Sequence, residues 1–202
     1  MSVPPTLGVV LAGGLARRMG GGDKGMRRVG GRSVLERLLE RFAPQVTRVI
    51  VNANGDPARF AALGLPVVPD GTPDHPGPLA GVLAGLDWAM AEAPEVEWVV
   101  SVPADAPFVP LDLVARLHAA RAEADAAMAC AASGGRTHPV VALWPVSARD
   151  RLGDTLAAGL RKVGAFTDGA ALAEWAAEPV DPFFNVNTPE DLAEADRVAA
   201  KL

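Results

Sequence analysis

Short, continuous apolar runs recur along the 202-residue chain, and segments with helical periodicity separate them. Apolar runs without alternation are typical of strands that are buried on both faces of a parallel sheet. This pattern predicts strands over residues 7–11, 48–52, 66–69, 97–102, 126–131 and 138–144, and an edge strand over residues 176–180.

Helix-start signals fall between these runs. Ser33 and Glu36 have the spacing of a capping box, and Thr188 with Asp191 marks a last helix that has Pro189 at its first position. The periodicity predicts further helices over residues 34–42, 57–63, 78–91 and 110–122, and helical stretches over residues 146–162. Strands that alternate with helices predict one domain over residues 1–202, a three-layer α/β/α Rossmann-like fold with a largely parallel central sheet.

The first predicted strand leads directly into a glycine-rich, cationic loop within residues 9–24. Glycine lacks a Cβ, so backbone N–H groups can approach an anion closely there. Arg17, Arg18 and Lys24 add full positive charges that suit phosphate oxygens. The loop therefore predicts binding of a di- or triphosphate, with a solvated surface loop as the alternative.

Two common phosphate motifs do not account for this loop. Lys24 is followed by Gly25 instead of the Ser or Thr of a P-loop. Gly20, Gly22 and Gly25 match G-x-G-x-x-G, but about ten residues separate them from the strand that the dinucleotide motif should adjoin. We interpret that match as chance.

Positive charge is concentrated near the loop. Residues 17–37 contain seven Lys or Arg and two acidic residues, whereas the whole chain has a net charge of −5. A local basic excess in an acidic protein favours a discrete anionic ligand and argues against nucleic-acid binding. The single Cys130 excludes an internal disulfide and is interpreted as a small core residue in a reducing compartment. Without a signal peptide or an apolar run of about 18 residues, we expect a cytoplasmic protein that does not enter membranes.

Polar side chains follow the predicted strands at their carboxyl ends, where ligands of such sheets bind. Gly13, Asn52, Asp70 and Asp105 each come after an apolar run, so we expect them to converge on one rim. Asp105 is the candidate ligand of Mg²⁺, which commonly takes one or two carboxylates beside phosphates and water. Asp70 could accept the adjacent N–H donors of a guanine edge, and Asn52 could contact ribose or base.

The histidines do not form a site in the sequence. His75, His118 and His138 are scattered and lack a Cys or His partner, which argues against zinc. His118 is interpreted as a helix-surface residue. No arrangement for covalent catalysis is recognisable.

Several blocks together carry a resemblance to a known family. The chain resembles nucleotidyltransferases of the sugar-nucleotide type, and specifically the molybdenum cofactor guanylyltransferases, in residues 11–14, 18–20, 23–24, 51–54, 76–81, 103–107, 138–139 and 185–190. Similar cytidylyltransferases tend to have alanine at the position of Gly13, so the glycine favours GTP over CTP. The tract Gly20-Gly21-Gly22 departs from the family, which often has a bulkier residue there.

The resemblance implies transfer of GMP from Mg-GTP to the terminal phosphate of molybdopterin, with release of pyrophosphate. It also implies residue roles. Leu11, Ala12 and Gly13 would contact the nucleotide, Asn52 and Asp70 would hold the nucleoside, Arg18 and Lys24 would stabilise the triphosphate and the leaving pyrophosphate, and Asp105 would bind Mg²⁺. Arg18, Lys24 and Asp105 are the catalytic candidates. Asn185 and Asn187 are candidates for the pterin phosphate or a second metal contact, with loop and helix capping as the alternative.

The resemblance further suggests a monomer whose partners include a molybdenum-insertion protein and apo-molybdoenzymes. Two other functions stay open. A same-fold enzyme could use CTP or activate a sugar phosphate, and a non-catalytic GTP-binding protein could deliver the cofactor.

An attacking phosphate is already ionised near neutral pH, so the guanylyl transfer requires no general base.

Overall fold

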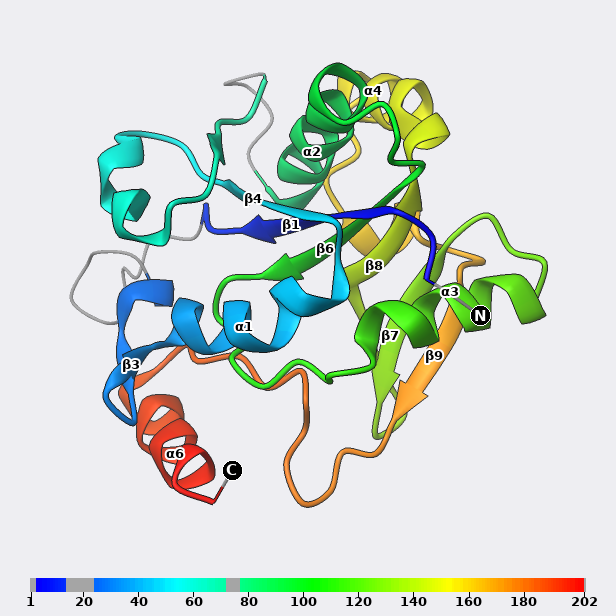
Figure 1. Ribbon diagram of the computed structural model, residues 1–202. Coiled ribbons are helices and arrows are strands. Elements are labelled where there is room, and N and C mark those ends of the chain that lie inside the picture. The colour runs from blue at the N-terminus through cyan, green and yellow to red at the C-terminus, as the bar shows by residue number, and fades with distance from the viewer. Residues whose placement is uncertain (1–2, 14–23, 72–76, 202) are drawn as a thin grey trace.

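The computed structural model describes residues 3–13, 24–71 and 77–201. Seven strands in the described part form one sheet in the order β5-β4-β1-β6-β8-β7-β9 (Figure 1). Their bounds are β1 (Thr6–Leu11), β4 (Arg48–Asn52), β5 (Val67–Val68), β6 (Trp98–Pro103), β7 (Ala129–Ser133), β8 (Arg136–Pro145) and β9 (Ala171–Trp175). A separate hairpin pairs β2 (Arg28–Val29) with β3 (Arg32–Ser33).

The sheet is largely parallel, as predicted. β1 pairs in parallel with β4 and β6, β4 with β5, and β7 with β9. β8 runs antiparallel to both of its neighbours, β6 and β7. The strands on the two sides of β8 therefore run in the same direction as one another, and β8 alone among these seven strands runs the opposite way.

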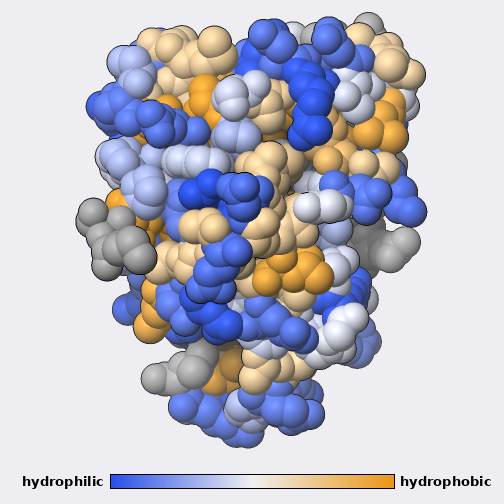
Figure 2. All heavy atoms as spheres, turned by 90° about the vertical axis from the view of Figure 1, so that its right-hand side faces the viewer, coloured by the Kyte–Doolittle hydropathy of each residue, from blue (hydrophilic) through white to orange (hydrophobic). Residues whose placement is uncertain are grey.

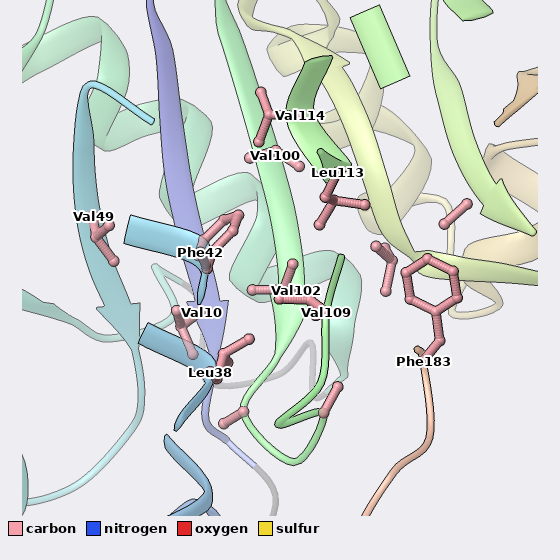
Figure 3. Close-up of a cluster of buried hydrophobic side chains, with 14 of the residues drawn as sticks. Val10, Leu38, Phe42, Val49, Val100, Val102, Val109, Leu113, Val114 and Phe183 are labelled. Atoms are coloured by element: carbon pink, nitrogen blue, oxygen red, sulfur yellow. The ribbon is translucent and has the colours of Figure 1, made fainter. Parts of the chain in front are cut away.

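Helices cover both faces of the sheet, which confirms the three-layer α/β/α fold (Figure 1). α1 (Val34–Phe42) and α3 (Leu113–Glu123) pack on one face, and α2 (Pro78–Glu92), α4 (Arg149–Ala157) and α5 (Val163–Phe166) pack on the other. Successive strand residues point to opposite faces of the sheet, so Val10 packs in the core under α1 and α3, and Val9 packs in the core under α2, α4 and α5. Figure 3 shows Val10 beside Leu38 and Phe42 of α1.

Both predicted capping boxes are present. Ser33 Oγ accepts the N–H of Glu36 at the start of α1, and Thr188 Oγ1 accepts that of Asp191 at the start of α6 (Pro189–Ala199). The reciprocal carboxylate bonds exist as well, so each box satisfies amide groups that the helix itself leaves without partners. α6 packs on the β2–β3 hairpin, where Gly30 donates its N–H to Asp196 Oδ1 (2.6 Å).

Short 3₁₀ helices complete the described chain. They are η2 (Lys24–Met26), η3 (Ala43–Gln45), η4 (Pro57–Leu63) and η5 (Val146–Ala148). The helix predicted over residues 57–63 is thus a 3₁₀ helix, and the helical stretches predicted over residues 146–162 are η5 and α4. α4 ends at Ala157, because the chain turns at Gly159, whose φ is 95°. α3 begins at Leu113, after the proline-containing turn that the prediction assigned to it.

The edge strand was predicted at the wrong residues. Residues 176–180 are not a strand, and the sheet edge is β9, whose residues alternate between exposed Leu172 and Glu174 and buried Ala173 and Trp175. Such alternation is the signature of a strand with one covered face. Residues 176–180 are exposed or half-buried throughout, so they offer no buried face to a sheet.

The surface assignment of His118 was also wrong. His118 lies on α3 with only 7% of its surface exposed, edge-on to Trp98 with the ring centroids 5.5 Å apart. Its Nε2 lies 2.9 Å from Thr6 Oγ1, and Thr6 donates its hydroxyl proton to Pro4 O. His118 Nε2 must therefore carry the proton of that bond. Burial lowers the pKa of His118 to about 4, and the positive charge of Arg121 acts in the same direction.

Small residues of α2 allow close packing on the sheet. A Cβ on Gly81 would lie 2.2 Å from Asn52 Oδ1, and one on Gly85 would lie 2.5 Å from Val9 Cγ2. The helix thus contacts β1 and β4 directly at these glycines. Buried Cys130 on β7 is a core residue, as predicted.

Figure 2 shows the face that lies on the right-hand side of Figure 1, where α3 and β9 are found. Strongly hydrophobic side chains occur on it in separate groups among hydrophilic ones, and Leu172 is 55% exposed. Among the described residues, no helix has the length and apolar character that crossing a bilayer requires.

Candidate functional site

Strand register brings the ends of three strands to the same level. Leu11 at the end of β1 pairs with Asn52 of β4 on one side and with Pro103 of β6 on the other. The ladder continues one step further, because Ala12 donates its N–H to Asn52 O (2.8 Å) and Ala104 donates to Leu11 O (3.1 Å). Residues that follow these strands are therefore held side by side.

A pocket with a volume of ≈ 390 Å³ lies at this rim. It contains seven of the residues that the sequence singled out as nucleotide, metal or pterin contacts, namely Leu11, Ala12, Gly13, Asn52, Asp70, Asp105 and Asn185. Pockets of this size are typical of small-molecule sites. The predicted convergence on one rim is confirmed as geometry.

Three predicted site residues are not placed in the pocket. Arg18 lies outside the described residues, as does the side chain of Lys24, whose backbone begins η2. Asn187 is not among the lining residues, and its backbone N–H donates to Asp191 Oδ2 (2.9 Å) in the capping box of α6. At the backbone level, Asn187 therefore follows the capping alternative.

Asp70 is held between two asparagine amides. Asn52 Nδ2 donates to Asp70 Oδ1 (2.9 Å), and Asn54 Nδ2 donates to Asp70 Oδ2 (2.7 Å). The second N–H of Asn52 donates to Val68 O (3.1 Å), so both of its amide protons are used within the protein. Since Asn52 is only 4% exposed, its main contribution to the pocket is to orient Asp70.

Asp105 stands in the turn after β6, half-buried at the pocket wall. Its carbonyl oxygen accepts the N–H of Val186 (2.8 Å), which brings the exposed side chain of Asn185 to the same wall. One carboxylate beside an amide fits a Mg²⁺ site that substrate phosphates complete, because Mg²⁺ favours hard oxygen ligands. No group of three or more His, Cys, Asp or Glu side chains in the described residues could hold a metal without such help.

An irregular pairing in β8 forms another wall of the pocket. β7 residues 130 and 131 pair with β8 residues 142 and 138, so the intervening residues of β8 bulge out of the ladder. The bulged Val140 lines the pocket, and its carbonyl oxygen accepts the hydroxyl of buried Ser101 (2.6 Å). Trp144 Nε1 in turn donates to Ser101 Oγ (2.9 Å), which fixes this arrangement.

Ser133, His138 and Asp181 form a hydrogen-bonded chain beyond this wall. Ser133 Oγ donates to Asp181 Oδ1 (2.8 Å), and it therefore accepts from His138 Nε2 (2.7 Å). Burial lowers the pKa of His138, Arg136 adds to this effect, and Asp181 opposes it. Because the serine proton goes to Asp181, His138 cannot act as a base toward it. The trio is a structural link and not a nucleophilic triad.

Some arginines of the basic segment, residues 17–37, form structural contacts within the protein. Arg37 donates to the carbonyl oxygens of Val29 and Gly30 in the β2–β3 hairpin, and Arg32 forms an ion pair with Glu40. The charges of these two arginines are used in local contacts. Fewer cations are therefore available to an anionic ligand than the count of Lys and Arg in residues 17–37 indicates.

Sequence reasoning missed other lining residues, including Gly25, Leu35, Phe60 and Val140. The amide of Asn54 belongs to the predicted block of residues 51–54 but received no role of its own, although it lies two residues after Asn52 and the side chains of alternate residues share a side. The bulge that brings Val140 to the pocket depends on Ser101 and Trp144, which no local pattern connects to it.

Comparison with known proteins gives consistent results. The model of the MobA-like NTP transferase domain matches residues 8–174. The chain is 57% identical to a molybdenum cofactor guanylyltransferase of Rhodopseudomonas palustris over 98% of this chain and 96% of that one. It is 56% identical to one of Nitrobacter hamburgensis, with 99% and 97% covered.

Solved structures share the fold. The molybdopterin-guanine dinucleotide biosynthesis protein A of Archaeoglobus fulgidus has a TM-score of 0.74 at 23% identity, covering 98% of this chain and all of that one. The 4-diphosphocytidyl-2C-methyl-D-erythritol synthase of Anaerococcus prevotii has a TM-score of 0.71 at 15% identity, with 98% and 96% covered. At these identities the likeness concerns the fold alone.

Proposed function

Because the chain belongs to the MobA-like NTP transferase family, and within it to the molybdenum cofactor guanylyltransferases, we propose that it transfers GMP from Mg-GTP to molybdopterin. It is a nucleotidyltransferase by this membership. The observation that carries the specific reaction is the convergence of Gly13, Asp70, Asp105 and Asn185 on one pocket. The proposed product is the guanine dinucleotide form of the cofactor.

The reaction is a substitution at the α-phosphorus of GTP. An oxygen of the terminal phosphate of molybdopterin forms a bond to that phosphorus, and the bond to the oxygen bridging the α- and β-phosphates breaks. Pyrophosphate leaves with the electron pair. Because the attacking phosphate is already an anion, alignment and charge neutralisation are the tasks left to the protein.

The described residues can divide these tasks. Asp70, oriented by two amides, offers acceptors to the nucleoside, while Leu11, Ala12 and Gly13 form the floor between it and Asp105. Asp105 would hold Mg²⁺, which supplies charge neutralisation at the phosphates when bound. Asn185 lies at the pocket wall next to Asp105 and is proposed to contact the pterin phosphate. Arg18 and Lys24 are proposed to stabilise the leaving pyrophosphate.

Pyrophosphate release tests the proposal. The purified protein is incubated with Mg²⁺ and each of GTP, CTP, ATP and UTP, with and without molybdopterin. We expect release with GTP when the pterin is present. Release with CTP instead would assign the chain to the cytidylyl branch, and GTP binding without release under any condition would favour a delivery protein.

A further inference from the structure

Asn54 and Asp70 are joined by two hydrogen bonds that run in opposite directions. Besides the bond from Asn54 Nδ2 to Asp70 Oδ2, the backbone N–H of Asp70 donates to Asn54 Oδ1 (2.9 Å). Each residue is thus donor and acceptor to the other. With Asn52 on its second oxygen, the Asp70 carboxylate is held at both oxygens and cannot rotate without breaking a bond.

Asn54 is itself fixed by the turn in which it lies. Arg59 Nη2 donates to Asn54 O (2.6 Å), and Arg59 Nε donates to Asp56 O (3.0 Å). Gly55 has a φ of 88°, a conformation that favours glycine and lets the chain turn tightly. The guanidinium of Arg59 lies 5.1 Å from the ring centroid of Phe60, which lines the pocket. The amide of Asn54 is therefore presented from a braced turn.

The bonds to Asn52 and Asn54 leave acceptor capacity on Asp70. An ionised carboxylate has about four acceptor positions, and the two amides use one on each oxygen. Each carboxylate oxygen of Asp70 therefore keeps a second acceptor position, and Asp70 lines the pocket. Guanine presents two adjacent donors, N1–H and the 2-amino group, which match a carboxylate; hypoxanthine has only N1–H.

From this geometry we infer that Asn54 is a positioning residue for guanine recognition, which acts through its two hydrogen bonds to Asp70. The inference rests on the proposed function, since it takes GTP as the donor. It predicts that the preference for GTP over ITP, which lacks the 2-amino group, depends on Asn54. A carboxylate that is already fixed accepts both donors of guanine without losing rotational freedom on binding, so its preference for guanine is larger.

The experiment measures equilibrium binding of GTP and ITP by calorimetry with Mg²⁺ present, together with KM and kcat for pyrophosphate release. Asn54→Ala should weaken GTP binding about tenfold, the loss of roughly one hydrogen bond, and should lower the GTP-to-ITP affinity ratio about fivefold. The kcat at saturating GTP should stay within about threefold, because Asp70 does not hold the reacting phosphate.

Asn54→Asp provides an isosteric comparison. It replaces the donor 2.7 Å from Asp70 Oδ2 by a carboxylate oxygen, so repulsion should turn Asp70 away and lower the GTP-to-ITP ratio below that of Asn54→Ala. Asp56→Ala is the matched control in the same turn. The Asp56 side chain accepts the N–H of Ala58 (2.9 Å) and caps the 3₁₀ helix η4, so its removal should leave the GTP-to-ITP ratio unchanged.

The outcomes separate the inference from the proposed function. A merely structural role for Asn54 would reduce the active fraction and leave the GTP-to-ITP ratio as in the wild type, which would overturn the inference. If Asp70→Asn removes the preference for GTP over ITP while Asn54→Ala keeps it, Asp70 recognises guanine without a contribution from Asn54. If the wild type binds neither nucleotide, the proposed function itself fails.

Discussion

Ser133 Oγ lies 2.8 Å from Asp181 Oδ1, and this bond ties the β7–β8 hairpin to the segment that reaches the pocket. Asp181 Oδ1 also accepts the N–H of Phe183 (2.9 Å), whose ring contacts those of His138 and Trp175 and belongs to the buried cluster in Figure 3. Five residues after Asp181, Val186 is bonded to Asp105 O. The segment with Asn185 is thus anchored at both ends.

Ser133→Ala should destabilise the fold by about 1–3 kcal/mol, because it removes the bridge between Asp181 and His138 in a buried place. Chemical unfolding with fluorescence detection checks this. Thr155→Ala removes an exposed hydroxyl that donates to Arg151 O and should change stability by less than about 0.5 kcal/mol. Equal effects of the two variants would contradict the role of the Ser133 link.

His118 should make the folded state less stable in acid. Its pKa is about 4 in the folded protein and 6.5 in the reference state, so the unfolded chain takes up the proton first. The neutral form contributes stability above pH 6.5, and that contribution is lost as the pH falls toward 4. The full loss is on the order of 3 kcal/mol.

His118→Gln keeps an amide that can donate to Thr6 but does not titrate. The free energy of unfolding, measured by denaturant titration from pH 7 to pH 4, should fall less steeply in this variant than in the wild type. Parallel pH profiles for the two proteins would show that His118 does not titrate as its burial requires.

Asp105→Ala should lower Mg²⁺-dependent pyrophosphate release at least about 10²-fold, comparable to the loss of one preorganised electrostatic contact. The proposed metal would lose its protein carboxylate, while the backbone bond from Val186 to Asp105 O can persist. Asp150→Ala, which removes a 90% exposed carboxyl on α4, is the control. Near-normal turnover of Asp105→Ala across a Mg²⁺ titration would refute the metal assignment.

Two helix glycines should respond to alanine with opposite signs. Gly85→Ala places a Cβ 2.5 Å from Val9 Cγ2 and should destabilise the protein by about 1–3 kcal/mol through overpacking. Gly153→Ala in α4 meets nothing closer than Arg149 Nη1 at 3.9 Å and should stabilise it by up to about 1 kcal/mol. The midpoint of thermal unfolding should fall for Gly85→Ala and rise for Gly153→Ala. Midpoints that shift in the same direction would contradict this prediction.

Local patterns were sufficient for the elements whose signals are short in range. The capping boxes at Ser33 and Thr188 predicted the starts of α1 and α6, and the apolar runs predicted β1 and β4 almost to the residue. These signals suffice because caps and buried strands are specified by residues close in sequence. β9 is not marked by such a signal, because its buried residues Ala173 and Trp175 become distinct from exposed Leu172 and Glu174 only in the folded sheet.

The chemical identity of the rim also followed from the sequence. Asn52, Asp70 and Asp105 each stand after an apolar run, and a parallel sheet places the ends of its strands on one edge. What those residues do to one another did not follow. Both amide protons of Asn52 bond to Val68 and Asp70, and the sequence did not indicate this pairing.

Folding alone established the contacts between residues far apart in the chain. His118 is buried because Thr6 and Trp98 from two strands enclose it, and Ser133 meets Asp181 across 48 positions of sequence. The chain's hydrophobic pattern thus specifies the layers and the edge at which ligands bind, because burial depends on local periodicity. Hydrogen-bond partners, protonation states and the orientation of Asp70 depend on which distant groups the packed layers bring within about 3 Å, and no local pattern records that.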